Sequence, residues 1–310
     1  IHDRMQGKEE NTPGTWSDFE YDFSGSIFFY PVDFTKSYYK KPVNFSGSTY
    51  QDWVDFSNSI YQSRADFNDS TYRNWADFRG SIYQGRADFN SSTYQNVVYF
   101  SDSTYRSEVC FNKSTYQDFV YFDRSIYQNW ADFYDSTYQD EASFTGSTYQ
   151  EGVDLSCSIY WGRANFRGSI YEDEAAFSGS IFRDTIDFGK DTGSGGSSRF
   201  TRCAPVFYDE ANQQNTLFGS HDNNFTAENG RGLPIYRNLE GLPLGCTFLT
   251  PAHKEYLGNI FQAMEEISNK NKIHAPHNPD KTKELSEKLR SLTQELDDWR
   301  EKVTAVEGNR

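Results

Sequence analysis

Two histidines three positions apart, His274 and His277, are the first place in this chain where metal chemistry could be sought. Imidazole is a common zinc ligand, but a zinc site needs about four ligands and usually draws on cysteine or carboxylate as well. No cysteine lies near the pair, and a proline stands between the two histidines. The pattern favours an exposed connecting segment, so the sequence predicts neither a metal site nor a cofactor.

Aspartates and serines recur along the chain and could act as acids, bases or nucleophiles. The serines stand every eleven residues from Ser26 to Ser180, and such repetition favours a structural role, because an active site needs only one. No Ser/His/Asp grouping is recognisable, and we predict no enzyme activity. The recurring aspartates are expected to point outward as a column of solvated acids: Asp55, Asp66, Asp77, Asp88 and Asp132.

The serines belong to an eleven-residue pattern, Ala/Val-x-Phe-x-x-Ser-x-Tyr, that recurs about fifteen times. A strict internal period is typical of a solenoid. A helix would spread the Phe, Tyr and Ala columns around its circumference, at about 100° per residue. Short strands instead place Ala with Phe, and Ser with Tyr, on one face, because side chains alternate with period two. The pattern therefore predicts short β-strands joined by tight turns rich in Gly, Asn and Asp.

Three columns of side chains are predicted to fill the core of this solenoid. A buried phenol needs a hydrogen-bond partner, so each tyrosine hydroxyl should bond within a ladder or reach a corner of the coil. Each serine hydroxyl should bond to the backbone. The columns include Phe45, Phe56, Phe67, Phe78 and Phe89, then Tyr50, Tyr61, Tyr72, Tyr83 and Tyr94, and finally Ser48, Ser59, Ser70 and Ser81.

This arrangement resembles the pentapeptide-repeat family over roughly residues 21–188. In that family a bulky residue, and a small one two places earlier, point into a narrow right-handed four-sided β-helix. Units here alternate five and six residues, and Tyr stands where Leu or Phe is usual, so we expect a bulge at one corner of each half-coil. Dipeptides such as Ser63-Arg64 and Gly85-Arg86 recur after 22 residues. The expected fold is mainly β, a right-handed β-solenoid of about 22 residues per coil.

Composition divides the chain into five regions. Residues 200–250 keep Phe, Tyr and Gly without a period and should form a degenerate repeat or cap, since the last coil of a solenoid otherwise exposes apolar surface and a strand edge. Thr250-Pro251 and Asn278-Pro279 are helix-start signals. The regions are an N-terminal extension or cap (1–20), the β-solenoid (21–188), a Gly/Ser linker (189–199), the irregular cap (200–250) and a helical tail (251–310) with helices at about 251–268 and 279–307.

The second predicted helix carries a heptad stripe, in which apolar residues alternate steps of four and three. Such a stripe can pair with itself in another subunit or pack on the helix at 251–268, and the sequence leaves both alternatives open. We expect the stripe to mediate self-association. The expected partner is therefore another copy of this chain, or else another protein. The stripe consists of Leu285, Leu289, Leu292, Leu296, Trp299, Val303 and Val306.

Charge and composition limit the ligands and the cellular locations that we expect for this chain. The 310 residues carry a formal net charge of −15, which disfavours nucleic acid as a ligand. No stretch is long enough to cross a membrane. No signal peptide is visible, although a leader or initiating Met could have preceded Ile1. Cys203 and Cys246 could pair. Five Asn-x-Ser/Thr sequons favour an extracellular or cell-surface location over the cytoplasm.

The expected function is a non-enzymatic structural or protein-interaction solenoid, a self-associating scaffold, surface or filament component. An alternative follows from the family resemblance. Some pentapeptide-repeat proteins are acidic rods that resemble DNA in shape and charge, and they bind and modulate DNA gyrase. A third possibility is that an outward threonine column binds an ordered surface such as ice or a glycan, through Thr71, Thr93, Thr104 and Thr115.

Overall fold

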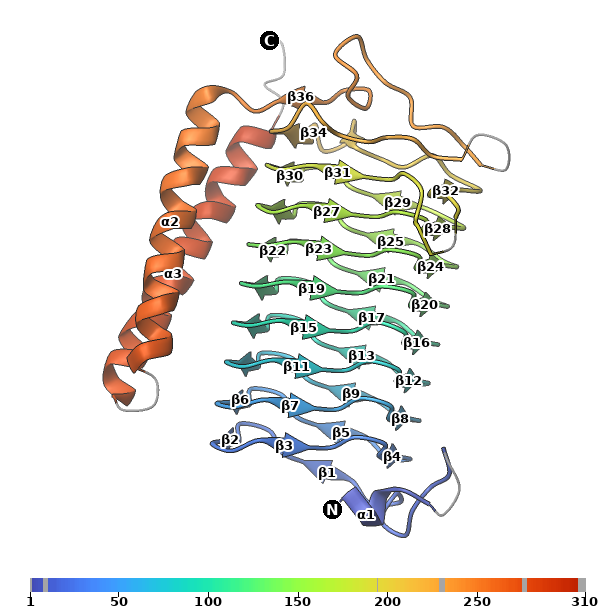
Figure 1. Cartoon of the computed structure of the whole chain (residues 1–310), viewed down its shortest axis with the longest axis vertical. Helices are drawn as coiled ribbons and strands as arrows, with labels where there is room; N and C mark the ends of the chain where they lie inside the picture. The colour runs from blue at the N-terminus through green and yellow to red at the C-terminus, as the bar shows by residue number, and fades with distance from the viewer. Residues whose placement is uncertain (1, 8–10, 194, 229–231, 275–277, 306–310) are drawn as a thin grey trace.

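The computed structural model describes residues 2–7, 11–193, 195–228, 232–274 and 278–305. The chain forms a straight rod of stacked coils, and two helices lie along one side of the rod (Figure 1). Each strand pairs in parallel with the strand 22 residues later, so that Thr71 lies opposite Thr93 and Tyr72 opposite Tyr94. The predicted right-handed β-solenoid with 22 residues per coil is therefore confirmed.

Every strand is two residues long, and the strands form four flat faces in the order in which the chain visits them. Face I comprises β1 (Tyr21–Asp22), β5 (Val43–Asn44), β9 (Ala65–Asp66), β13 (Ala87–Asp88), β17 (Val109–Cys110), β21 (Ala131–Asp132), β25 (Val153–Asp154) and β29 (Ala175–Ala176). Face II comprises β2 (Ile27–Phe28), β6 (Thr49–Tyr50), β10 (Thr71–Tyr72), β14 (Thr93–Tyr94), β18 (Thr115–Tyr116), β22 (Thr137–Tyr138), β26 (Ile159–Tyr160), β30 (Ile181–Phe182), β35 (Leu217–Phe218) and β36 (Thr247–Phe248).

Faces III and IV complete the coil, and face IV lies opposite face II. Face III comprises β3 (Val32–Asp33), β7 (Val54–Asp55), β11 (Ala76–Asp77), β15 (Val98–Tyr99), β19 (Val120–Tyr121), β23 (Ala142–Ser143), β27 (Ala164–Asn165) and β31 (Ile186–Asp187). Face IV comprises β4 (Tyr38–Tyr39), β8 (Ile60–Tyr61), β12 (Ile82–Tyr83), β16 (Thr104–Tyr105), β20 (Ile126–Tyr127), β24 (Thr148–Tyr149), β28 (Ile170–Tyr171) and β32 (Arg199–Phe200).

Two kinds of corner join the faces. The turn after each phenylalanine places its second residue at positive φ, every eleven residues from Gly25 to Gly179. Glycine enters this region without steric cost, and Asn, Asp or Ser fills several of the other positions. The other corner follows each tyrosine column position, where the repeat takes six residues instead of five to reach the next phenylalanine. A bend such as 51–52 accommodates the extra residue, and there the Trp53 N–H donates to Asp52 Oδ1 at 2.8 Å. This bend takes the place of the expected bulge.

The interior is a set of stacked aromatic columns. Phe45 and Phe67, one coil apart, stack with ring centroids 5.2 Å apart and planes within 7°. Phe45 also meets Phe56 of the next half-coil edge to face, at 4.9 Å. Both are favourable aromatic geometries. Small inward residues such as Ala65 and Val54 leave room for the rings, and the core is fully buried along the shaft.

The stacking continues beyond residue 188. After a loop, β32 extends face IV, and β35 and β36 extend face II. A short antiparallel pair, β33 (Tyr208–Asp209) and β34 (Gln214–Asn215), lies in the connecting segment. The predicted linker at 189–199 therefore leads from β31 of face III to the start of β32 of face IV. At the other end, α1 (His2–Met5) and residues 11–20 lie against the first coil, where the Lys40 N–H donates to Ser17 O, and Met5 is buried.

The tail forms two antiparallel helices, α2 (Pro251–His274) and α3 (Pro279–Thr304). Thr250 Oγ1 accepts the His253 N–H, and Asn278 Oδ1 accepts the Lys281 N–H, so both predicted N-caps are present. The prediction that the first helix ends near residue 268 is wrong. The segment from 269 lacks a helix-breaking residue before Pro276, and α2 continues to His274.

Candidate interaction surfaces

The serine hydroxyls of the core column form hydrogen bonds with backbone groups of the neighbouring coil. Ser70 Oγ donates to Phe45 O at 3.1 Å and accepts the Ser48 N–H at 3.2 Å. The same pair of bonds recurs at successive coils, for example Ser92 Oγ to Phe67 O. Ser48, Ser59, Ser70 and Ser81 are all buried. Each hydroxyl thus ties its own coil to the preceding one through two bonds, which is the backbone-bonding role expected from the sequence.

The tyrosine columns behave differently from expectation. Tyr50 and Tyr72 stack with centroids 4.9 Å apart and planes within 4°, and Tyr61, Tyr83 and Tyr94 continue the same arrangement. This spacing carries neighbouring hydroxyls beyond hydrogen-bond distance. Among the described residues, no group bonds to these buried hydroxyls. The predicted hydrogen-bonded ladder is absent from this part of the chain, and burial raises the pKa of every one of these phenols.

The aspartates do not form a column of solvated acids. Asp77 and Asp88 are buried, while Asp55, Asp66 and Asp132 are half-buried. Their carboxylates accept backbone N–H groups two residues ahead, as in the 2.9 Å bond from the Ser57 N–H to Asp55 Oδ1. This local turn bonding draws the acids toward the backbone. Burial raises the pKa of Asp55, Asp88 and Asp132.

The remaining candidates for chemistry are dispersed. His277 lies outside the described residues, and His274 is the last residue of α2. Within the described ranges, no group of three or more His, Cys, Asp or Glu side chains could hold a metal ion. Cys203 and Cys246 are both free thiols, and burial raises the pKa of Cys246 to about 12.

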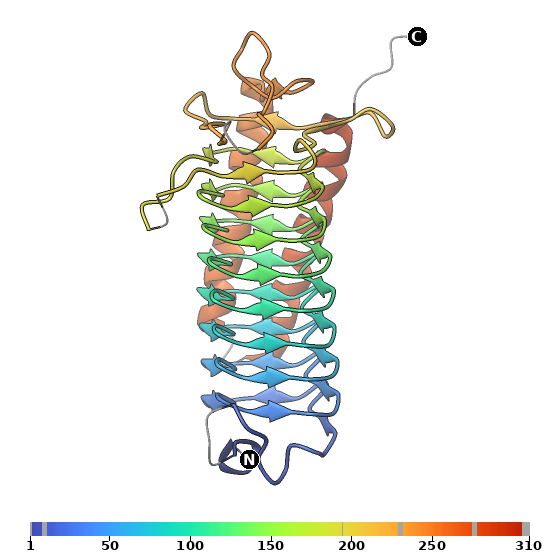
Figure 2. The same ribbon diagram turned by 90° about the vertical axis from the view of Figure 1, so that its right-hand side faces the viewer.

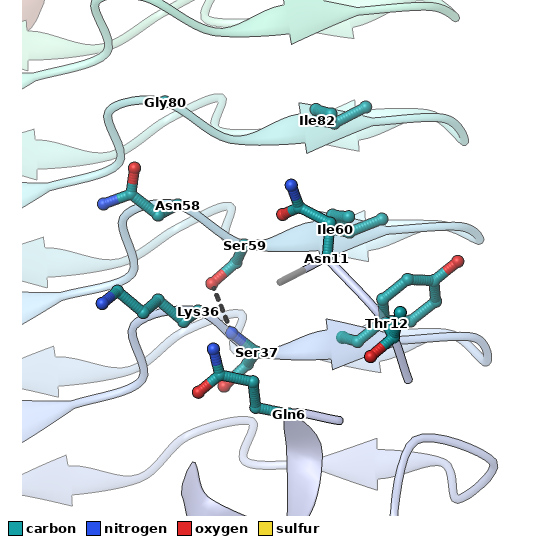
Figure 3. Close-up of a pocket in the computed structure, with 11 residues that line it drawn as sticks. Gln6, Asn11, Thr12, Lys36, Ser37, Asn58, Ser59, Ile60, Gly80 and Ile82 are labelled. Carbon is teal, nitrogen blue, oxygen red and sulfur yellow. Dashed lines mark hydrogen bonds between the residues drawn. The ribbon is translucent and has the colours of Figure 1, made fainter. Parts of the chain in front are cut away.

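A polar recess of about 250 Å³ lies between the N-terminal segment and the first coils (Figure 3). Lys36, Asn58 and Gly80, all turn residues at positive φ, follow one another along its wall. Amides and hydroxyls supply the rest of its polar lining, and none of the described residues around it is a carboxylate, histidine or cysteine. The recess can therefore offer hydrogen bonds but no acid–base pair.

The heptad stripe packs within the chain. Leu285, Leu289 and Leu296 are buried, and Leu292, Trp299 and Val303 pack beside them, whereas Val306 lies outside the described residues. Apart from Leu285, these described stripe residues share one apolar cluster with residues of α2 and with outward residues of face II, which include Ile159, Ile181 and Leu217. Of the two alternatives that the sequence left open, the structure places the stripe against α2 and the rod.

Polar and aromatic contacts fix this helical pair on face II. Phe261 stacks on Trp161 at 4.4 Å, and Lys254 Nζ donates to Gly219 O at 2.7 Å. Face IV, opposite, carries a column of β-branched side chains, and Figure 2 shows that no helix covers it. The threonine column is divided between the two, because Thr71, Thr93 and Thr115 belong to face II and Thr104 to face IV. The four threonines therefore do not form one flat binding surface.

Exposed large apolar side chains gather at the two ends of the rod. Among the described residues, the shaft exposes two such side chains, Ile126 and Trp130, and α2 exposes Ile273. We name the two groups the N-end patch, composed of Trp16, Phe19, Ile27, Phe29 and Tyr30, and the C-end patch, composed of Leu233, Tyr236, Leu239 and Leu244.

Comparison with known proteins gives no functional assignment. A scan of family models, a search of curated proteins and a search of solved structures each return no match to this chain. Neither of the long helices that the structure describes is apolar enough along a sufficient length to span a bilayer. The functional argument therefore depends on the geometry of the rod itself.

Proposed function

We propose that this chain is a non-enzymatic structural rod that associates with copies of itself and serves as a scaffold, filament or surface component. The observation that carries this proposal is the gathering of exposed apolar side chains into the N-end and C-end patches. Exposed apolar clusters on a folded protein mark contact surfaces. On a rod, patches at the two ends favour contacts along the axis.

Two further features support a structural role. The aromatic columns and serine bonds repeat from coil to coil, so each coil is bonded to and packed on its neighbours along the shaft. The heptad stripe is occupied by α2 and face II, so the proposed association does not use it. Opening that stripe to another subunit would expose the apolar residues of face II to water at a cost of about 25 cal/mol per Å².

We also propose a relation to pentapeptide-repeat proteins, because each half-coil carries a small and a bulky residue that point inward. The DNA-mimic alternative receives less support. A mimic needs a continuous negative face, but arginines lie among the acids of face III: Arg79 pairs with Asp77, and both Arg163 and Arg167 pair with Asp187. The extracellular or cell-surface setting stays a prediction, which glycosidase treatment of the native protein would check.

Light scattering of the full chain over a wide range of protein concentration tests the proposal. Self-association predicts a mass that rises with concentration, and electron microscopy should then show rods joined along their long axis. A monomer at every concentration would contradict it. Inhibition of gyrase that weakens with salt, by a chain that remains monomeric, would instead support the DNA mimic.

A further inference from the structure

An ordered loop presents the C-end patch. Residues 236–244, which we name the end loop, form a tight antiparallel turn in which the Leu244 N–H donates to Tyr236 O at 3.1 Å. Asn238 holds the turn: its Oδ1 accepts the Glu240 and Leu242 N–H groups at 3.0 and 3.1 Å. Its Nδ2 also donates to Cys246 O at 3.1 Å, which ties the end loop to the start of β36.

The end loop holds apolar side chains away from its own fold. Leu239 is fully exposed at the tip, and Tyr236 and Leu244 are more than half exposed. A loop already fixed by hydrogen bonds has little conformational entropy to lose on docking. Tyr236 adds an aromatic ring, a type of side chain that is enriched at protein–protein contacts. These properties are those of a preformed docking element.

The opposite end offers a matching apolar surface. Phe29 and Tyr30 follow β2, the first strand of face II, and Tyr30 is 81% exposed. Ile27 of β2 and Phe19 of the preceding segment are also exposed. Face II therefore begins beside the N-end patch at β2 and ends at β36, next to the end loop, at opposite ends of the rod (Figure 1).

Parallel backbone pairing runs along face II and leaves a strand edge at each end. The Thr49 N–H donates to Ser26 O near the N-end, and the Leu249 N–H donates to Phe218 O near the C-end. β2 and β36 are the first and last strands of this sheet, and the outer edge of such a strand carries both N–H and C=O groups. The outer edge of β36 in one copy can therefore pair with the outer edge of β2 in the next copy and keep the parallel direction of the ladder.

We propose that the end loop of one copy docks on the N-end patch of the next, so that the rods join head to tail. This inference rests on the proposed self-association and specifies its interface. The two contacting surfaces differ, so the contact is heterologous. A heterologous contact that does not close into a ring generates an open filament. Each added copy would continue the direction of the parallel ladder that already joins the coils.

Complementation between two blocked variants tests the direction of assembly. Phe29→Glu blocks the N-end patch, and Leu239→Glu blocks the end loop. Both side chains are largely exposed, so neither change removes core packing. Ile126→Glu on the shaft is the matched control, because it adds the same charge to an exposed apolar position. Circular dichroism verifies that all three variants are folded.

Head-to-tail joining predicts that each blocked variant alone is monomeric and that the Ile126→Glu control assembles like the unmodified chain. An equal mixture of Phe29→Glu and Leu239→Glu should form dimers and nothing larger, since one intact loop and one intact patch remain. If the unmodified chain assembles but the mixture yields no dimer, or if either variant dimerises alone, the head-to-tail inference is wrong and self-association stands. If the unmodified chain is monomeric at all concentrations, both proposals fail.

Discussion

Arg300 Nη2 lies 2.7 Å from Asp135 Oδ1, and this ion pair joins α3 to the turn between β21 and β22. The guanidinium is buried, with 1% of the Arg300 side chain exposed. No other described ion pair links the helices to the solenoid. Because most of the remaining contact between the two is apolar and therefore weakly directional, this pair fixes the position of α3 along the rod.

Removing the acid from this pair should loosen the helices. Asp135→Asn leaves a buried guanidinium without its counter-charge, and we expect the free energy of unfolding to fall by about 3 kcal/mol. The double variant Asp135→Asn/Arg300→Met should recover most of that loss, because it leaves no buried charge. Urea unfolding and amide exchange in α3 measure both. Equal losses in the single and double variants would show that the ion pair does not govern docking.

Asp297, one turn before Arg300, should make docking depend on pH. Burial raises the pKa of Asp297 to about 7; Asp135, Asp298 and Glu301 add to the rise, and Arg300 opposes it. The carboxyl binds its proton more tightly in the folded state than in the unfolded chain, where its pKa is about 3.9. The contribution of Asp297 to stability is therefore greatest below about pH 4, falls as pH rises through about 7, and is constant above.

Thermal unfolding of the Asp297→Asn variant between about pH 4 and pH 8 checks this sign. The substitution should raise the melting temperature at the alkaline end and flatten the profile. Glu287→Gln, at an exposed position of α3 that is not among the groups named above, is the control and should keep the slope of the unmodified chain. A profile for Asp297→Asn with the unmodified slope would assign the pH dependence to other groups.

The aromatic and serine columns should respond in opposite directions to loss of a hydroxyl. Tyr94→Phe removes a buried hydroxyl that no described group bonds, so stability should be unchanged or rise by up to about 1 kcal/mol. Ser92→Ala removes the bond to Phe67 O and leaves the Ser70 N–H without its acceptor, which should cost about 1–3 kcal/mol. Urea unfolding measures the change in the free energy of unfolding for both variants. A loss for Tyr94→Phe as large as that for Ser92→Ala would indicate a bonded phenol.

The period of the sequence was enough to predict the solenoid, because stacking like on like every 22 residues fixes register without knowledge of distant contacts. The same repetition made the inward Phe45 and Ser48 columns recognisable. Asp77 was misjudged because period-two alternation gives the direction of a side chain but not its local bonding. The turn bond to the Arg79 N–H and the pairing with the Arg79 guanidinium bury the carboxylate that alternation alone would leave in water.

The interaction surfaces were harder to predict than the shaft. A heptad stripe such as that of Leu289 and Leu296 has the same spacing whether its partner is another subunit or its own rod. The choice between these two partners depends on Ile159 and Ile181, which are distant from the stripe in the sequence and face outward on face II. The end loop has no period at all, and its order comes from the side chain of Asn238, so no sequence pattern marked it.

The turn column gives a prediction that separates backbone strain from packing. Ser91 adopts φ +54° at an exposed position, where a side chain adds little contact. A left-handed residue with a Cβ costs about 1–2 kcal/mol, and a β-branched one is disfavoured further. Ser91→Val should therefore be less stable than Ser91→Gly by about 1–2 kcal/mol in urea unfolding.

Thr104, in strand β16 of face IV, provides the matched control for this turn effect. Its backbone is extended, so Thr104→Val should be more stable than Thr104→Gly, because β-branched residues favour strands and glycine weakens them. The order of stability should thus reverse between the two sites. The same order at both would mean that side-chain packing, rather than the φ of the turn, determines which residues the repeat accepts.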